Sequence, residues 1–287
     1  MQAAILALII FPGVRQSFGQ SQYVRTTNLL AVADANMMSG NPDANLGNQI
    51  FVTTGVDSSG TNRGLFRFDL SRIPTNATVT NVTLKLVAFS TPPSGILFGL
   101  SLLLTNWDEY WASWNSRYYL TSWTAPGGQA GTDFYSFPSA LATAGSTTTL
   151  TDNGSNPFFG LVHDVQTWVS HPAQNFGWML AAADESSTNS LFLICSREFF
   201  GIEPVLTVGY TQPFTPPFIQ GSMITNGVFQ FSFNVEPYHG YVVQRCSDLA
   251  GTNWVTVIIL DPPPWPTETT FFDPLTISNC FYRVVSR

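Results

Sequence analysis

The sequence carries very little charge. Only 10% of its 287 residues are Asp, Glu, Lys or Arg, and Lys85 is the single lysine, whereas about a quarter of the residues of a typical globular protein are charged. So few Lys and Glu residues exclude long charged helices. The net charge is −7 and no basic patch is visible, which argues against nucleic acid and anionic membrane surfaces as partners. Such a surface suits neutral ligands or other proteins.

Cysteines are also scarce, and none lies in a CxxC pair, so zinc and thioredoxin-type chemistry have no support. An odd count of three leaves one unpaired in a secreted chain. Cys246 and Cys280 share the C-terminal region and are candidates to pair across adjacent strands. Cys195 lies in the apolar run SLFLIC and is expected to be a buried free thiol.

Catalytic motifs are missing as well. The sequence has no HExxH, HxH, GxSxG, P-loop or GxGxxG pattern. The histidines at 163, 171 and 239 flank a helix candidate or lie in a turn, where solvated or capping roles are expected. We therefore predict no catalytic residues and no required cofactor. A lyase that uses Arg117, Tyr118 and His163 stays open as a minor alternative.

Aromatic and turn-forming residues are abundant. Aromatics make up 14% of the chain, and Thr, Ser, Asn, Gly and Pro separate short apolar runs, which is typical of an all-β protein. Residues 63–71 alternate polar and apolar side chains, so one face of that strand is expected inside and one outside. Residues 96–105 are apolar on both faces and indicate a central strand. The best helix candidate is 163–170, with an apolar stripe on one face.

Composition changes divide the chain into four parts. Residues 1–21 contain the apolar run Ala3–Phe11, which indicates a signal peptide or, alternatively, a retained N-terminal apolar strand. Residues 22–211 predict a jelly-roll β-sandwich. Residues 212–217 form a Pro-rich linker, and 218–287 predict a smaller β-sandwich domain. No segment of the mature chain is predicted to span a membrane.

The stretch TNWDEYWASWN, residues 105–115, is the main site candidate. Sugar rings pack on aromatic side chains while nearby carboxylates and amides bond their hydroxyl groups. The spacing of Trp107, Trp111 and Trp114 also fits one helical face, so a core or corner role is the alternative for these rings. The predicted ligand-binding residues are Trp111, Tyr118, Trp123, Arg117 and Glu109. Of these, Trp111, Tyr118 and Trp123 are the best candidates for exposure.

Two further polar groups stand out. Arg197 and Glu198 are expected to form a structural ion pair or to cap a turn. The oxygen-rich residues Asp34, Asn36, Asp43 and Asn45 predict either solvated turns or, as an alternative, a structural calcium site.

Several pieces of the chain resemble one family. VADANMMSGNPDANLGN, RGLFRFDLSRIPTNATVTNVTLKL, NWDEYWASWN and SREFFGIEPVLTVGY follow in order within residues 31–210. This region is similar to the DNRLRE-domain family of secreted β jelly rolls, some of which are carbohydrate-binding modules. The tail resembles small C-terminal β domains of secreted bacterial proteins. The hexapeptide that names the family is absent here.

The leading hypothesis is therefore a secreted, non-enzymatic protein that binds a polysaccharide or another cell-surface polymer. The alternative is a structural subunit of an extracellular filament, sheath or surface layer, assembled from copies of itself by β-strand addition. Low charge and abundant apolar residues favour the second hypothesis, since both ease close contact between subunits.

Overall fold

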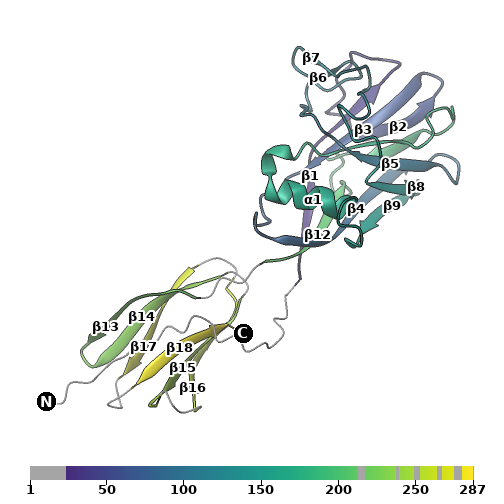
Figure 1. The fold of residues 1–287 in the computed structure, drawn as a ribbon. Coiled ribbons are helices and arrows are strands. Elements are labelled where there is room, and N and C mark those ends of the chain that lie inside the picture. Colours follow the sequence, from purple (N-terminus) through teal and green to yellow (C-terminus); the bar gives the residue numbers. More distant parts are fainter. Residues whose placement is uncertain are drawn as a thin grey trace. The chain divides into compact units, whose positions relative to one another are not determined.

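The computed structural model describes residues 24–212, 217–236, 239–248, 253–263, 267–274 and 280–286. These residues form two compact units, 24–212 and 217–286, each of which is described by itself. Within them lie eighteen β-strands, one α-helix and one short 3-10 helix (Figure 1). The predicted all-β sandwich class is confirmed. The N-terminal segment 1–21 and linker residues 213–216 lie outside the described residues.

Twelve of these strands belong to the first unit. Their bounds are β1 Arg25–Met38, β2 Phe51–Asp57, β3 Gly60–Phe68, β4 Thr78–Ser90, β5 Leu97–Leu102, β6 Ser116–Tyr118, β7 Thr121–Ser122, β8 Ala140–Thr143, β9 Thr147–Asp152, β10 Trp178–Ala182, β11 Phe192–Cys195 and β12 Val205–Thr211. Ten of them run in the order β1-β12-β4-β11-β2-β3-β10-β5-β8, with β9 also on β4. Strand β5, predicted to be central, does have a neighbour on each side.

Strand β1 closes this sheet on itself. Its first part, Arg25–Leu30, pairs with β12, whereas Ala31–Met38 pairs with β3. The register shifts between Ala31 and Ala33, and irregularities of this kind bend a strand. One strand therefore belongs to both layers and gives the sandwich its barrel-like closure.

The main core lies inside this closed sheet. Phe66 and Phe68 of β3 and Trp178 of β10 are fully buried there. Helix α1, Leu161–Ser170, covers part of the core with an apolar face that includes Trp168, whose ring centroid is 4.5 Å from that of Trp178. The helix prediction is confirmed, with two more residues at the start. Among the described residues no helix is long and apolar enough to cross a membrane.

A second apolar cluster lies on the opposite side of β1, β3 and β10. Met37, Leu65 and Met179 are buried there against Trp107 and Trp123. Alternation along β3 predicted one face inside and one outside, but Leu65 on the second face is fully buried. That expectation was wrong because the connection between β5 and β8 folds over the outer face of the sheet. Alternation along a strand shows which residues share a face, but it does not show whether another segment of the chain covers that face.

The second unit is a small sandwich of two three-stranded sheets. Its strands are β13 Ile219–Thr225, β14 Val228–Val235, β15 Tyr241–Cys246, β16 Val255–Leu260, β17 Thr267–Pro274 and β18 Phe281–Ser286. Their orders are β13-β14-β17 and β16-β15-β18. Phe229, Phe231 and Phe233 alternate inward along β14 and pack with Tyr241 and Tyr282. Alternate residues of β14 thus face the core of this sandwich.

All three cysteines are free, buried thiols. The suggested pairing of Cys246 with Cys280 is therefore not formed. The register of β15 and β18 places Cys246 opposite Phe281, and neighbouring residues along a strand point to opposite faces. Cys280 consequently lies in the sandwich core on the other side of the sheet. The buried thiol expected at Cys195 is confirmed, and burial raises its pKa.

Because the outer face of β3 is covered, we expect truncation of Leu65 to destabilise the fold much more than truncation of Leu30. Leu65→Ala should lower the free energy of unfolding by about 2–5 kcal/mol, because a buried leucine leaves a cavity. Leu30→Ala, at an exposed position of β1, should change it by no more than about 0.5 kcal/mol. Urea unfolding of both variants measures this difference. Equal, small effects would show that the outer face is open.

Candidate functional site

The connection from β5 to β8, residues 103–139, carries the candidate site. Its inner side is fixed to the domain by buried indole groups. The Nε1 of Trp107 donates to the carbonyl of Phe176 at 2.7 Å, and the Nε1 of Trp123 donates to the carbonyl of Ser113 at 2.9 Å. Both rings are buried. Because buried N–H groups need partners, these bonds hold the connection in one conformation.

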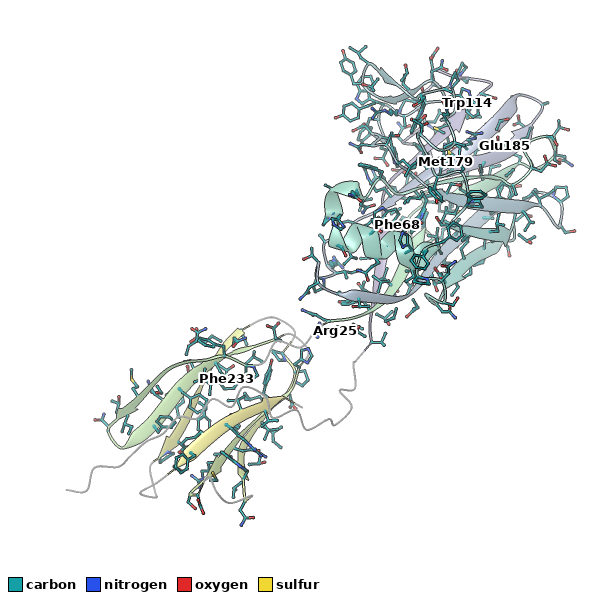
Figure 2. All side chains as sticks on the ribbon, viewed as in Figure 1. Arg25, Phe68, Trp114, Met179, Glu185 and Phe233 are labelled. Atoms are coloured by element: carbon teal, nitrogen blue, oxygen red, sulfur yellow. The ribbon has the colours of Figure 1, made fainter. Side chains whose placement is uncertain are left out.

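Arg63 holds the later part of the same connection through its contacts with two aromatic rings. The guanidinium of Arg63 on β3 lies over the rings of Trp114, at 5.3 Å, and Phe134, at 5.6 Å. It also donates two hydrogen bonds of 2.7 Å to the carboxylate of Glu185. Figure 2 shows Trp114 and Glu185 in the same part of the domain. The core or corner role expected for Trp107 and Trp114 is confirmed.

The outer side of the connection presents open aromatic side chains. We call this set the aromatic shelf; its exposed members, from two adjoining turns, are Tyr110, Trp111, Tyr118, Tyr119 and Leu120. The rings of Trp111 and Tyr119 meet edge to face with centroids 4.7 Å apart, an arrangement that aromatic pairs favour. Trp111 is 49% exposed and Tyr119 is 54% exposed. These two rings are braced against each other and still open to a ligand.

The turn between β6 and β7 places an apolar side chain in solvent. Leu120 has φ of 51° and is 88% exposed. Left-handed backbone is uncommon for residues other than glycine and asparagine, and such outliers concentrate at functional sites. Figure 1 shows this hairpin, β6 and β7, at one end of the domain. Its position leaves the shelf accessible.

A buried charged network lies below the shelf. Both carboxylate oxygens of Glu109 accept hydrogen bonds from Arg197, at 2.7 and 2.9 Å. Glu109 also accepts the backbone N–H of Asp34, and Asp34 accepts the backbone N–H of Arg197 at 2.8 Å. Glu198 forms a second ion pair with Arg197 at 3.1 Å, so the ion pair expected there is confirmed. These bonds tie the shelf connection to the turn after β11.

Two carboxylates, Glu109 and Glu198, pair with the guanidinium of Arg197, and the carboxyl group of Asp34 lies beside them on the Arg197 backbone. Burial raises the pKa of Asp34 to about 7, and the negative charges of Glu198 and Glu109 contribute to the shift. The hydrogen bond from the Arg197 backbone opposes it. Asp34 is therefore protonated in part near neutral pH, which relieves repulsion among the three groups.

The predicted ligand-binding residues divide into two groups. Trp111 and Tyr118 are exposed as expected, and their role in binding stays a prediction. Trp123 and Glu109 do not lie at the surface, because the connection turns both side chains toward the sheet. Arg117 is half-buried and donates to the carbonyl of Asn106 at 2.8 Å.

Three shelf members, Tyr110, Tyr119 and Leu120, are not among the predicted ligand-binding residues. Tyr110 lies inside the quoted stretch, so its residue type was a usable signal. Leu120 has no such signal, because only the turn conformation exposes it.

The side chains of the oxygen-rich residues are bonded within the protein, and the calcium alternative stays a prediction. Asn36 and Asn45 use their amide nitrogens to bond backbone carbonyls, and Asp43 accepts from Asn115 at 2.8 Å. Asp34 faces Arg197 instead. No group of three or more His, Cys, Asp or Glu side chains in the described part of the chain is arranged to hold a metal ion.

The alternative lyase trio is not assembled. His163 lies on α1, where its Nδ1 contacts the carbonyl of Pro157 at 3.1 Å. Arg117 and Tyr118 belong to β6, and Figure 1 shows β6 at one end of the domain and apart from α1.

Comparison with known proteins identifies one family. The family model described as the Disaggregatase related repeat domain matches residues 34–203. No curated protein matches the sequence significantly. A solved structure, the glycoside hydrolase domain of Endo-D from Streptococcus pneumoniae R6, aligns at 12% identity with a TM-score of 0.19. That alignment covers 88% of this chain and 31% of the hydrolase chain, and a likeness this low carries no argument.

The resemblance to the DNRLRE-domain family was wrong. The matching family is the disaggregatase-related repeat, and no DNRLRE-domain model matches. The pieces that suggested the resemblance are mostly strand-and-turn patterns, which jelly rolls of different families share. The missing hexapeptide was the more informative feature.

The buried network predicts a pH-dependent effect of one substitution. Between pH 4 and 7 folded Asp34 keeps a proton that the unfolded chain, with an ordinary pKa of 3.8, has lost. Rising pH therefore weakens folding through this group. Asp34→Asn should gain stability relative to wild type over this interval, by on the order of a few kcal/mol. Urea unfolding at each pH measures the difference.

The matched control is Asp184→Asn. The pKa of Asp184 is lowered by hydrogen bonds from Ser186, so its ionised form favours folding and the substitution should not gain stability as pH rises. A difference between Asp34→Asn and wild type that does not change with pH would contradict the prediction.

Proposed function

The chain belongs to the disaggregatase-related repeat domain family, and we propose that it is a secreted, non-enzymatic protein that binds an extracellular polysaccharide through the aromatic shelf. The observation that carries the proposal is the exposed, mutually braced pair of Trp111 and Tyr119.

The chemistry of the shelf favours a neutral, hydroxyl-rich ligand. The apolar face of a sugar ring packs on an aromatic ring, which removes apolar surface from water. Backbone and side-chain polar groups beside Trp111, including the carboxylate of Asp108, are suited to bonding hydroxyl groups. Low overall charge gives no long-range attraction for polyanions.

The carboxylates nearest the shelf support binding rather than catalysis. Glycosidases need two carboxyl groups that face the scissile bond from opposite sides. Glu109 is 5% exposed and directs both oxygens at Arg197, so it does not face a ligand on the shelf. Asp108 accepts the backbone N–H of Tyr110 at 2.9 Å, which gives it a role in shaping the turn.

Removing one ring of the shelf tests the proposal. Trp111→Ala should weaken binding of the recognised polysaccharide about tenfold or more, because exposed tryptophans at binding surfaces contribute disproportionately. Its thermal stability should stay close to wild type. Affinity electrophoresis and titration calorimetry with a panel of soluble polysaccharides measure both ligand choice and affinity.

The control removes an exposed ring outside the shelf. Phe158→Ala, on the connection before α1, alters an exposed aromatic outside the shelf and should bind like wild type. Failure of the wild-type protein to bind any glycan on an array or any insoluble polysaccharide in a pull-down would refute the proposed function.

A second candidate function, a self-assembling structural subunit, is favoured by strand β16. Among the described residues β16 pairs only with β15, so one edge is open. Its sequence VTVIIL has no charge, glycine or proline, and Val255, Ile258 and Ile259 are exposed. Edge strands are usually protected by charge or proline because open edges recruit other strands. The apolar segment Ala3–Phe11, outside the described residues, stays the predicted donor in this alternative.

A charged side chain introduced on the β16 edge tests the second candidate function. Ile259→Lys should convert assemblies to monomers if β16 pairs between copies, whereas Leu30→Lys on β1 should not. Light scattering after size exclusion, across a concentration series, measures the oligomeric state. Wild-type protein that stays monomeric throughout would remove this candidate.

A further inference from the structure

The outer face of the sheet β13-β14-β17 has an ordered set of polar and apolar side chains. The register places Gln230 of β14 between Met223 of β13 and Phe272 of β17. Residues directly opposite each other in an antiparallel sheet point to the same side. Phe229 and Phe231 point to the core, so Gln230, Met223 and Phe272 share the outer face.

The next row on this face carries hydroxyl and amide groups. Ser232 lies between Gln220 of β13 and Thr270 of β17. The hydroxyls of Ser232 and Thr270 bond each other at 2.8 Å. The amides of Gln220 and Gln230 have no side-chain hydrogen bond to any residue that the structure describes, so their donors and acceptors are available to a ligand.

This face is hollowed where a side chain is missing. A depression of about 260 Å³ is lined by Gln220, Gly221, Met223, Gln230, Phe231, Ser232, Glu268 and Thr270. Gly221 has φ of +56°, and no atom lies within 4 Å of the position that a Cβ would take there. The register of β13 shifts beside it. Gly221 therefore leaves the edge strand β13 without a side chain beside the hollow.

We propose that the outer face of β13-β14-β17 is a second carbohydrate-contact face, which binds a neutral polysaccharide chain. Phe272, 59% exposed, provides a ring for a sugar to pack on. Gln220, Gln230, Ser232 and Thr270 provide amide and hydroxyl groups for its hydroxyls. The inference rests on the proposed function, since the ligand is the same polymer class.

Charge and shape select this ligand class. Glu268 is the only charged side chain that lines the hollow, which disfavours anionic polymers and gives no cluster for a cation. The hollow lies on a sheet face, whereas an added protein strand needs a sheet edge. An amide-and-hydroxyl surface with an exposed ring beside it is the combination that a sugar chain needs.

The test uses the full-length protein with one ring removed on each face. Phe272→Ala and Trp111→Ala are compared with wild type by affinity electrophoresis in laminarin, hydroxyethylcellulose, galactomannan, xylan and dextran, with polygalacturonate as the anionic probe. The neutral polysaccharide that retards wild type is then titrated by calorimetry. Phe272→Ala should weaken binding at least about fivefold, and the double variant should lose it.

Two further variants separate a site from a disturbed fold. Gln230→Ala, which keeps Phe272, should also weaken binding. Val285→Ala, an exposed apolar position on the opposite sheet of the same unit, should bind like wild type. Thermal unfolding checks that all variants fold. Equal losses in Val285→Ala and Phe272→Ala would overturn the inference.

The remaining outcomes distinguish the two proposals. If Trp111→Ala loses binding while Phe272→Ala and Gln230→Ala bind like wild type, the second face is refuted and the aromatic shelf stands. If Phe272→Ala loses binding and Trp111→Ala does not, the second face stands and the shelf is refuted. Retardation by polygalacturonate alone, or by no polysaccharide, overturns the inference.

Discussion

The packing of Trp107 and Trp123 on the outer face of β1, β3 and β10 is the contact on which the candidate site depends. Without it, Met37, Leu65 and Met179 would be open to water, and burial of such side chains contributes about 1.5–3 kcal/mol each. The same packing determines which rings of the connection between β5 and β8 stay outside. Stability and ligand access therefore come from one arrangement of one segment.

Hydrogen bonds and an ion pair hold these packed side chains in one arrangement. The indole N–H groups of Trp107 and Trp123 each have a carbonyl partner, and Glu109 is bonded to Arg197. Removing one partner of such a buried pair leaves a charge without compensation. The network thus joins the segment that carries the shelf to the turn after β11. A shelf on such a support needs little ordering when a ligand binds, which preserves affinity.

The two faces proposed for ligands use different local structure for the same physical task. The shelf is built on turns, where the left-handed Leu120 brings an apolar side chain into solvent. The second face is built on a three-stranded sheet, where Gly221 leaves the edge strand β13 without a side chain beside the hollow. In both, an exposed ring lies beside polar groups in a protein with little charge. That combination suits a neutral polymer better than an ionic one.

The sequence by itself determined the class of the fold and most of its elements. Strand alternation along β14 and the apolar stripe of α1 are local patterns, and local patterns survive in any compact fold that buries one face. The exposure of Trp111 and Tyr118 was predicted as well. The sequence also contained the evidence against the DNRLRE family, in the form of a missing hexapeptide.

Only the tertiary structure decided which aromatic side chains face a ligand. Trp111 and Trp123 have the same chemistry and lie in the same segment, yet one is open and the other is buried. The free cysteines Cys246 and Cys280 show the same limit, because strand register places them on opposite faces. Burial in this protein depends on which distant segment covers a face, and that is a long-range property that neither periodicity nor residue type contains.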